Sequence, residues 1–222
     1  MAGPTLVIAS KNPGKIREFT ALFSGLALEL KSLLDFPELP EVVEDGLTFL
    51  DNARKKAQAV LTATGLAALA DDSGLEVAAL GGRPGVFSAR YAADRTHLRP
   101  PTDRDNYLKL LEEMAAIPWE RRQARFVCVI VLALPHGREI VAQGVCEGYI
   151  ALEPRGQGGF GYDPVFWLPQ YRCTMAEVEL ATKNRISHRA AALVQLRATL
   201  EEALAQQPEL FSDLSRDVAQ PG

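Results

Sequence analysis

The chain has few of the residues that cross-link proteins or bind soft metals. Its 222 residues include three cysteines and three histidines, and Cys128, Cys146 and Cys173 form no Cys-x-x-Cys pair. This spacing excludes a zinc-ribbon or dithiol redox motif, and an odd number of cysteines does not suit a disulfide framework. We therefore expect reduced thiols, as in a cytoplasmic protein.

A surplus of positive charge and a long apolar run are also missing. The formal net charge is -4, so no excess of cations exists to neutralise a nucleic-acid backbone, and a long nucleic acid is not an expected partner. The longest strongly apolar run, residues 126–134, is far shorter than the roughly 18 residues of a membrane-spanning helix. The run at residues 6–9 is too short for a signal-peptide core. We expect a soluble cytoplasmic protein that is not inserted in a membrane.

What the chain does contain is enough apolar material for one sizeable core, because 47% of its residues are hydrophobic. A short β-forming run at 5–10 precedes a helix pattern at 12–25. A second helix pattern, at 48–65, opens with capping-box spacing and precedes another apolar run at 66–72. This alternation of strands and helices is typical of α/β architecture.

The pattern changes in the second half of the chain. We expect a helix from Thr102 that ends before Pro118, followed by antiparallel strands at 124–134 and 138–152 joined by a turn. A glycine- and proline-rich loop without regular structure is expected at 153–169. A last helix, capped by Ser187, should follow. No linker divides the chain, so we expect a single domain over residues 1–205. Residues 206–222 lose periodicity, and this tail is expected to be frayed.

The turn into the first helix is a candidate anion site. Backbone N–H groups at a helix N-terminus and the helix dipole both attract anions, so we expect the segment to bind phosphate. The segment comprises Ser10, Lys11, Asn12, Pro13, Gly14 and Lys15. It is not a Walker motif, because Ile16 stands where serine or threonine would follow the lysine. The alternative is a well-capped helix with solvated lysines.

Two adjacent carboxylates, Asp71 and Asp72, stand at the expected C-terminal end of the strand at 66–72. Open α/β sheets bind ligands at this end, and repulsion between the two charges favours a cation beside them. Oxygen ligands without nearby histidine or cysteine indicate Mg²⁺ or Mn²⁺. Glu44 is a candidate further ligand. The alternative is that both aspartates are turn formers before Gly74.

Two further segments are candidates for binding a nucleotide. The segment 158–164 combines glycines with Phe160 and Tyr162, whose rings can stack on a flat heterocycle. The segment 183–189 gathers lysine, arginine and histidine around a helix start. The alternatives are a rigid turn with aromatic rings in the core and ordinary basic residues at a cap.

Lys56 is a separate candidate, because it shares a helix face with Asn52 opposite the apolar stripe. A lysine in this position is by default simply solvated.

Taken together and in this order, these segments resemble the inosine triphosphate pyrophosphatase family, which includes the dITP/XTP diphosphatases. The matching segments are "IASKNPGKIREF", "GLTFLDNARKKA", "ADDSGLEVAALGGRPGVFSARYA", "GGFGYDPVF" and "ISHRAAAL". The resemblance implies a long mixed sheet flanked by helices, two lobes with an active-site cleft between them, and commonly a homodimer. It also implies Mg²⁺-dependent hydrolysis of the deaminated purine nucleoside triphosphates ITP, dITP and XTP to the monophosphate and pyrophosphate, which cleanses the nucleotide pool.

The resemblance further implies a role for each matching residue. Asp72 stands where the family has its general base and metal ligand, and Glu44 and Asp71 where it has supporting acidic residues. The triphosphate-binding positions match Ser10, Lys11, Asn12, Pro13, Gly14, Lys15 and Lys56, and Ser73 matches a further substrate contact. The base and sugar pocket matches Phe160, Gly161, Tyr162, Asp163, Lys183, His188 and Arg189. Many members have Thr-Gly-Asn where this chain has Ser10-Lys11-Asn12, and the serine retains a hydroxyl near the phosphate.

Two other interpretations stay open at this point. An aspartyl-phosphate phosphatase also uses a strand-end aspartate, as a covalent nucleophile, but it requires a second aspartate two residues after the first. Here Ser73 and Gly74 follow Asp72. A nucleotide sensor could use the same residues to bind without cleaving. The three interpretations differ in their products: pyrophosphate, orthophosphate or none.

Overall fold

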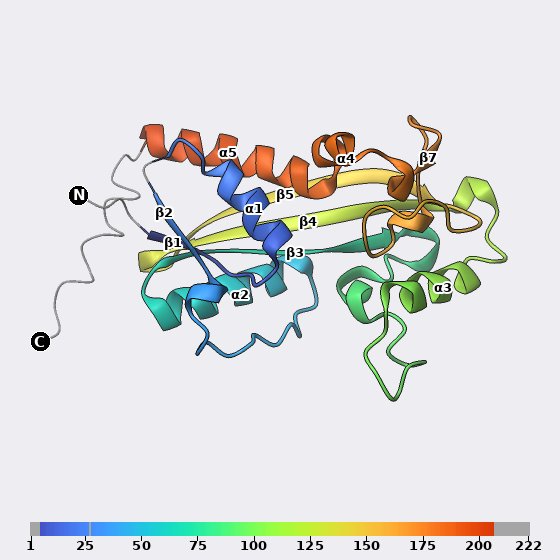
Figure 1. Ribbon diagram of the computed structural model, residues 1–222, viewed down its shortest axis with the longest axis horizontal. Helices are drawn as coiled ribbons and strands as arrows, with labels where there is room; N and C mark the ends of the chain where they lie inside the picture. The colour runs from blue at the N-terminus through green and yellow to red at the C-terminus, as the bar shows by residue number, and fades with distance from the viewer. Residues whose placement is uncertain (1–4, 27, 207–222) are drawn as a thin grey trace, which may run out of the picture. The chain divides into compact units, whose positions relative to one another are not determined.

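The computed structural model describes residues 5–26 and 28–206 of the chain, and their strands form a seven-stranded sheet (Figure 1). In sheet order the strands are β2 (Glu29–Ser32), β1 (Thr5–Ile8), β3 (Ala67–Val77), β4 (Gln123–Leu134), β5 (Arg138–Ile150), β6 (Phe166–Leu168) and β7 (Cys173–Thr174). β1 is parallel to β2 and β3, whereas β6 is antiparallel to β5 and β7. The sheet is mixed, which confirms the predicted α/β class.

The α-helices of the described part of the chain are α1 (Pro13–Leu22), α2 (Phe49–Thr64), α3 (Asp103–Glu113), α4 (Leu180–Ile186) and α5 (His188–Gln206). Among them, none combines the length and the apolar character that a membrane crossing requires. The predicted tail begins at the last residue of α5, and residues 207–222 lie outside the described residues.

The chain forms two compact units. Unit 1 comprises Met1–Asp72, Val129–Gln143 and Ala192–Gly222, and unit 2 comprises Ser73–Cys128 and Gly144–Ala191. β3, β4 and β5 each contribute residues to both units. The active-site cleft expected between two lobes stays a prediction.

Local signals in the sequence determine where the helices of unit 1 begin. Asn12 caps α1, because its Oδ1 accepts hydrogen bonds from two backbone N–H groups of the first turn. Thr48 and Asp51 form the predicted capping box of α2. Figure 1 shows α5 on one side of the strands of unit 1 and α2 on the other. Val60 of α2 is buried against Val7 of β1, so the apolar face of this helix covers the strands.

The core of unit 2 encloses a buried cation. The guanidinium of Arg122 is 2% exposed and donates hydrogen bonds to the backbone oxygens of Met114, Ile117, Ile150 and Ala151. Burial lowers the pKa of Arg122 from its usual value. α3 ends before Met114, earlier than predicted, and the chain after it supplies two of these four acceptors.

One prediction for the C-terminal third was wrong. The loop expected at 153–169 contains β6, which pairs with β5 because Phe166 and Leu168 are buried in the core of unit 2. A separate short helix, α4, ends at Ile186 just before the last helix, and no prediction was made for it. Ser187 still caps α5 as predicted, since its Oγ accepts a hydrogen bond from Ala190 N at 3.2 Å.

The cysteines behave as the sequence predicted. All three are described, and no disulfide joins them. Burial raises the pKa of Cys146 to about 11, so this thiol is protonated at neutral pH.

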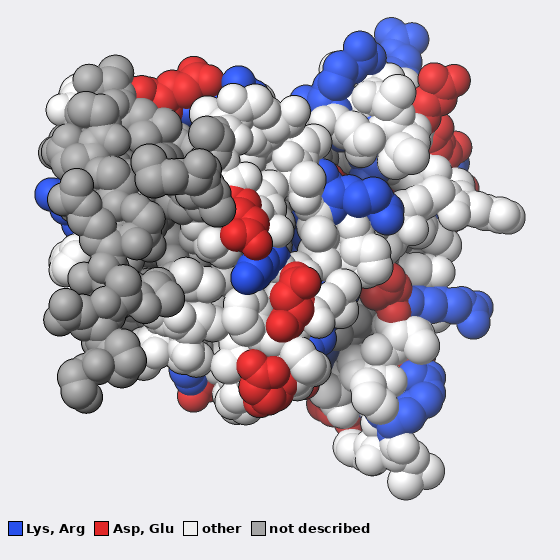
Figure 2. Space-filling model, turned by 60° about the vertical axis from the view of Figure 1, so that its left-hand side comes forward, with Lys and Arg blue, Asp and Glu red and all other residues white. Residues whose placement is uncertain are grey.

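Acidic and basic side chains are interspersed on the face that Figure 2 presents. Two surface pairs of unit 1 are Arg54–Glu139, at 2.7 Å, and Lys55–Asp45, at 2.5 Å. The exposed Lys55–Asp45 pair contributes little to stability.

Candidate active site

Asp71 and Asp72 lie within β3, not at its end as predicted, because the strand continues to Val77. Both are buried, with 4% and 9% of their surface exposed. The neighbouring strand β1 ends sooner, at Ile8, whose partner on β3 is Leu69. Beyond this pair, β1 gives way to the turn that leads into α1. This turn, and not a paired strand, therefore lies beside Asp71 and Asp72.

A lysine lies beside each aspartate. Lys15 Nζ is 2.8 Å from Asp71 Oδ1. Lys56 Nζ is 2.9 Å from Glu44 Oε1 and 3.7 Å from Asp72 Oδ1. Without these partners, each carboxylate would be a buried charge without a compensating cation. The structure thus brings together Lys15, Lys56 and the three predicted acidic residues, all in unit 1.

The predicted phosphate-binding turn is also a well-capped helix start. The N–H groups of Gly14 and Lys15 both donate to Asn12 Oδ1, and Asn12 N donates to Ser10 Oγ at 3.1 Å. Several of the backbone donors of this turn are therefore already engaged. Positive charge for an anion comes from Lys11, which is exposed, and from Lys15.

A cavity of about 560 Å³ opens in unit 1 beside this turn. Its polar lining consists of Ser10, Lys11, Asn12, Lys15, Glu41, Glu44, Lys56 and Asp71. Its apolar lining includes Leu33, Leu39, Val42 and Val60. Most of the residues predicted to hold phosphates thus line one cavity, whereas Pro13 and Gly14 form the helix turn behind it.

The role of one buried residue of the site was missed in the sequence. Asn52 and Lys56 were expected opposite the apolar stripe of α2, and this placement was wrong, because Asn52 is buried together with Ala53 and Ala57. Asn52 of α2 is fully buried, and its Nδ2 donates a hydrogen bond to Asp72 Oδ2 at 3.0 Å. Its Oδ1 accepts a hydrogen bond from Gly46 N at 2.8 Å. The available signal was its spacing of four residues from Lys56, which places both on one face of α2.

The acidic residues fit a hard cation only in part. Their donor atoms are carboxylate oxygens, which suit Mg²⁺. Within the described ranges, no group of three or more histidine, cysteine, aspartate or glutamate residues could hold a metal by itself. Mg²⁺ commonly uses one or two carboxylates together with substrate phosphates. Of the three predicted ligands, Glu44 and Asp71 line the cavity, whereas Asp72 is not among its lining residues.

The predicted base-binding residues lie in unit 2, where Asp163 is the centre of a small network. Asp163 is 4% exposed, accepts a hydrogen bond from Phe160 N at 2.8 Å and pairs with Lys183 Nζ. Burial raises the pKa of Asp163, and Lys183 opposes this rise. At Gly159 (φ 76°) a Cβ atom would collide with the carboxylate of Asp163, so only glycine fits there.

The two aromatic rings of the glycine-rich loop have different surroundings. Tyr162 is buried in the core of unit 2, and its hydroxyl donates to Ser88 O at 2.8 Å, as the alternative of a rigid turn predicted. Phe160 is 63% exposed, and Lys183 Nζ lies 4.9 Å from its ring centroid. Phe160 is therefore the ring that can stack on a flat heterocycle.

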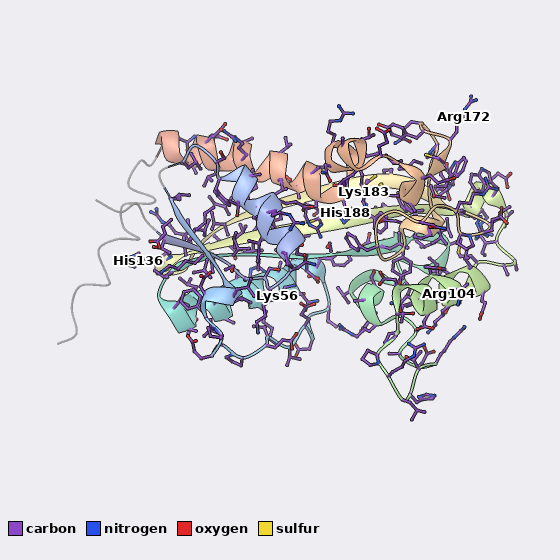
Figure 3. All side chains as sticks on the ribbon, viewed as in Figure 1. Lys56, Arg104, His136, Arg172, Lys183 and His188 are labelled. Carbon is purple, nitrogen blue, oxygen red and sulfur yellow. The ribbon has the colours of Figure 1, made fainter. Side chains whose placement is uncertain are left out.

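The remaining predicted residues of unit 2 lie near the start of α5 and on β3. Figure 3 shows Lys183 and His188 close to the junction of α4 and α5. The ring of His188 stacks on Phe126, with centroids 4.9 Å apart. Arg189 is 8% exposed, and Ser73 is half-buried in β3. The predicted phosphate and cation residues thus belong to unit 1, apart from Ser73, and the predicted base and sugar residues to unit 2.

These observations define a class: an α/β protein in which one buried carboxylate, Asp71, lines a cavity together with Glu44 and three lysines. The chain belongs to the Ham1 family, whose model matches residues 6–199. This match confirms the resemblance that the motifs indicated.

Named relatives match nearly the whole chain. The dITP/XTP pyrophosphatase of Geobacillus kaustophilus (strain HTA426) is 52% identical over 197 residues, which cover 89% of this chain and 94% of the relative. The protein of the same name from Geobacter sulfurreducens is 50% identical over 192 residues, which cover 86% of this chain and 94% of the relative. The solved structure of a HAM1 protein from Coxiella burnetii has a TM-score of 0.82 at 43% identity, covering 90% of this chain and 100% of that chain.

Proposed function

We propose that this protein hydrolyses the nucleoside triphosphates dITP, XTP and ITP between the α and β phosphates, giving the monophosphate and pyrophosphate. The observation that carries the proposal is the 52% identity, over 89% of the chain, to a protein named dITP/XTP pyrophosphatase. The site supports it, since Lys15 and Lys56 lie beside carboxylates at a cavity in unit 1. Removal of deaminated purine nucleotides from the pool is the corresponding cellular role.

Lysines of the site would bind the phosphates. Lys11 and Lys15 in the first turn and Lys56 on α2 can each donate hydrogen bonds to phosphate oxygens and neutralise the charge that develops there. Lys15 and Lys56 are now within 3.7 Å of carboxylates. When the triphosphate binds, the two lysines would replace these carboxylate contacts, wholly or in part, with contacts to phosphate oxygens.

Asp72 is the proposed general base, which accepts a proton from the attacking water. Asp71, Asp72 and Glu44 are the residues that would hold Mg²⁺, or Mn²⁺ in its place. When bound, such a cation supplies charge neutralisation on the phosphates. Ser73, directly after the proposed base, is a further candidate substrate contact.

The residues of unit 2 would bind the base and sugar. Phe160 offers an exposed ring for stacking. Donors on Arg189 or His188 would suit the 6-carbonyl group of hypoxanthine and xanthine. The 6-amino group of adenine would leave such a donor unmatched, which costs about 1–3 kcal/mol. ATP is therefore expected to be a poor substrate.

Product analysis tests the proposal. The purified protein is incubated with dITP and Mg²⁺, and pyrophosphate and orthophosphate are measured separately. The proposal predicts pyrophosphate and dIMP in equal amounts. Orthophosphate would favour an aspartyl-phosphate phosphatase, and unchanged dITP would favour a nucleotide sensor.

Two further expectations are part of the proposal. The resemblance supports a homodimer, which light scattering after gel filtration would distinguish from a monomer by mass. Nucleotide-pool chemistry supports a cytoplasmic location, and fractionation of cells that express the tagged chain would test it.

A further inference from the structure

We propose that Asn52 is a positioning residue for the reaction: it fixes the orientation of the Asp72 carboxylate and ties it to the loop that carries Glu44. The inference rests on the proposed function, because Asp72 is the proposed base of that reaction. Asn52 itself is not expected to contact the nucleotide, since its amide is buried and both of its ends have protein partners.

The two hydrogen bonds determine which way the amide of Asn52 points. Asp72 Oδ2, as a carboxylate oxygen, accepts and therefore needs the Nδ2 donor of Asn52. Gly46 N can only donate and therefore needs the Oδ1 acceptor. An aspartate at position 52 would place an acceptor against an acceptor. A leucine of similar shape would leave Gly46 N and Asp72 Oδ2 without this partner.

The contacts also make the two oxygens of Asp72 inequivalent. Oδ2 is held by the neutral amide of Asn52, and Oδ1 lies 3.7 Å from the ammonium group of Lys56. Asn52 and Lys56 are one helical turn apart on α2, and Lys56 also contacts Glu44. One face of α2 therefore holds both Asp72 and the segment 44–46. Loss of the Asn52 amide would let the carboxylate rotate away from the direction set by Lys56.

Gly46 provides independent support for this close approach. A Cβ atom at position 46 would lie 2.7 Å from Asn52 Oδ1 and 2.8 Å from Asp51 Cβ. Any larger residue would push the loop away from the amide. The same Cβ atom would lie 3.1 Å from the backbone N of Asn52. Glycine thus permits the close approach of segment 44–46 to the first turn of α2, which brings Gly46 N within hydrogen-bond distance of the Asn52 amide.

The experiment compares Asn52→Asp and Asn52→Leu with the matched control Asn106→Asp. Asn106 is also buried, at 2% exposed, and makes two hydrogen bonds, but both are to backbone groups of unit 2, Ala92 N and Ala89 O. The measurements are kcat with dITP, the Kd of an α,β-methylene analogue of dITP with Mg²⁺, and the melting temperature. All activity is measured well below the melting temperature of each variant.

We expect both Asn52 variants to lose about 10- to 100-fold in kcat, the usual effect of removing a partner that orients a ligating side chain. The Kd of the analogue, measured at saturating Mg²⁺, should change by less than about threefold, because the phosphate-binding lysines are untouched. Asn106→Asp should lower the melting temperature and leave kcat within about threefold of the parent. This split between kcat and Kd separates positioning from a purely structural role.

An Asn52→Leu variant that folds and keeps its kcat within about threefold would overturn the inference, whatever Asn52→Asp does. A loss of kcat matched by an equal loss in the control would do the same. If the parent itself releases no pyrophosphate from dITP, the proposed function fails and the inference with it. An active parent with fully active variants refutes the inference alone.

Discussion

Lys183→Met should destabilise the protein by leaving Asp163 buried without its cation. The side chains of the pair are 16% and 6% exposed for lysine and aspartate. Removal of one partner from a buried ion pair typically costs about 3–5 kcal/mol. Because the lysine retains some contact with water, we expect about 3 kcal/mol. For a chain of this size that corresponds to a fall of about 6–12 °C in melting temperature.

The loss of stability in the Lys183→Met variant should depend on pH. Burial raises the pKa of Asp163 above 3.8, and Lys183 opposes the rise. An acid whose pKa is higher in the folded state stabilises the fold most below its unfolded pKa, and this contribution is lost as the pH rises through the folded pKa. Without Lys183 the pKa of Asp163 rises further. The difference in stability between the variant and the parent should therefore be largest near neutral pH and become smaller on acidification toward pH 5.

Thermal unfolding followed by circular dichroism at pH 5 and pH 7.5 measures both effects. Lys55→Met is the matched control, since Lys55 and Asp45 are 44% and 67% exposed and such an exposed pair contributes little to stability. A Lys183→Met variant that melts within about 2 °C of the parent at pH 7.5 would refute the reasoning. An equal fall in melting temperature at both pH values would show that the charge of Asp163 does not cause the loss of stability.

Three further predictions concern the reaction. Asp72→Asn should reduce turnover of dITP by at least about 10³-fold while the Kd of an α,β-methylene analogue stays within about threefold, and normal turnover would remove Asp72 from the role of base. Arg189→Ala should lower the ratio of ITP to ATP hydrolysis by about 10-fold. The control Arg185→Ala, at an exposed position of α4, should leave this ratio unchanged. Equal ratios in both variants and the parent would contradict a role of Arg189 in base selection. Treatment with a chelator should abolish turnover and Mg²⁺ should restore it, so undiminished activity of the metal-free protein would exclude the proposed cation.

The parts of the fold that local chemistry determines were predictable from the sequence. The cap at Asn12 and the capping box at Thr48 follow from short-range hydrogen bonds, and the structure has both. β6 was missed because only three residues form it and its position depends on pairing with β5. The end of β3 was misplaced because the strand continues past the charged residue Asp72. No local signal in the sequence reports that Lys56 lies 3.7 Å from this carboxylate.

The site shows the same division. Lys15 was predicted as part of a helix N-terminus that attracts anions, and Asp71 and Asp72 as adjacent carboxylates near a strand end. Lys56 was supported mainly by the resemblance. The structure places these residues together. Asn52 was missed because a buried amide has the same sequence pattern as any polar residue on a helix. The proposed role of Asn52 depends on its hydrogen bonds to Gly46 and Asp72, two residues that are distant from each other in the sequence. Tyr162 and Phe160 were predicted alike, and only packing distinguishes the core ring from the exposed one.

The most direct test of the central claim is the identity of the phosphorus product formed from dITP by the purified protein with Mg²⁺. Phosphorus NMR resolves pyrophosphate, orthophosphate and the nucleotides in one sample. The account predicts that pyrophosphate and dIMP accumulate together from the first turnovers. Release of orthophosphate with dIDP, or dITP that remains intact, would contradict it.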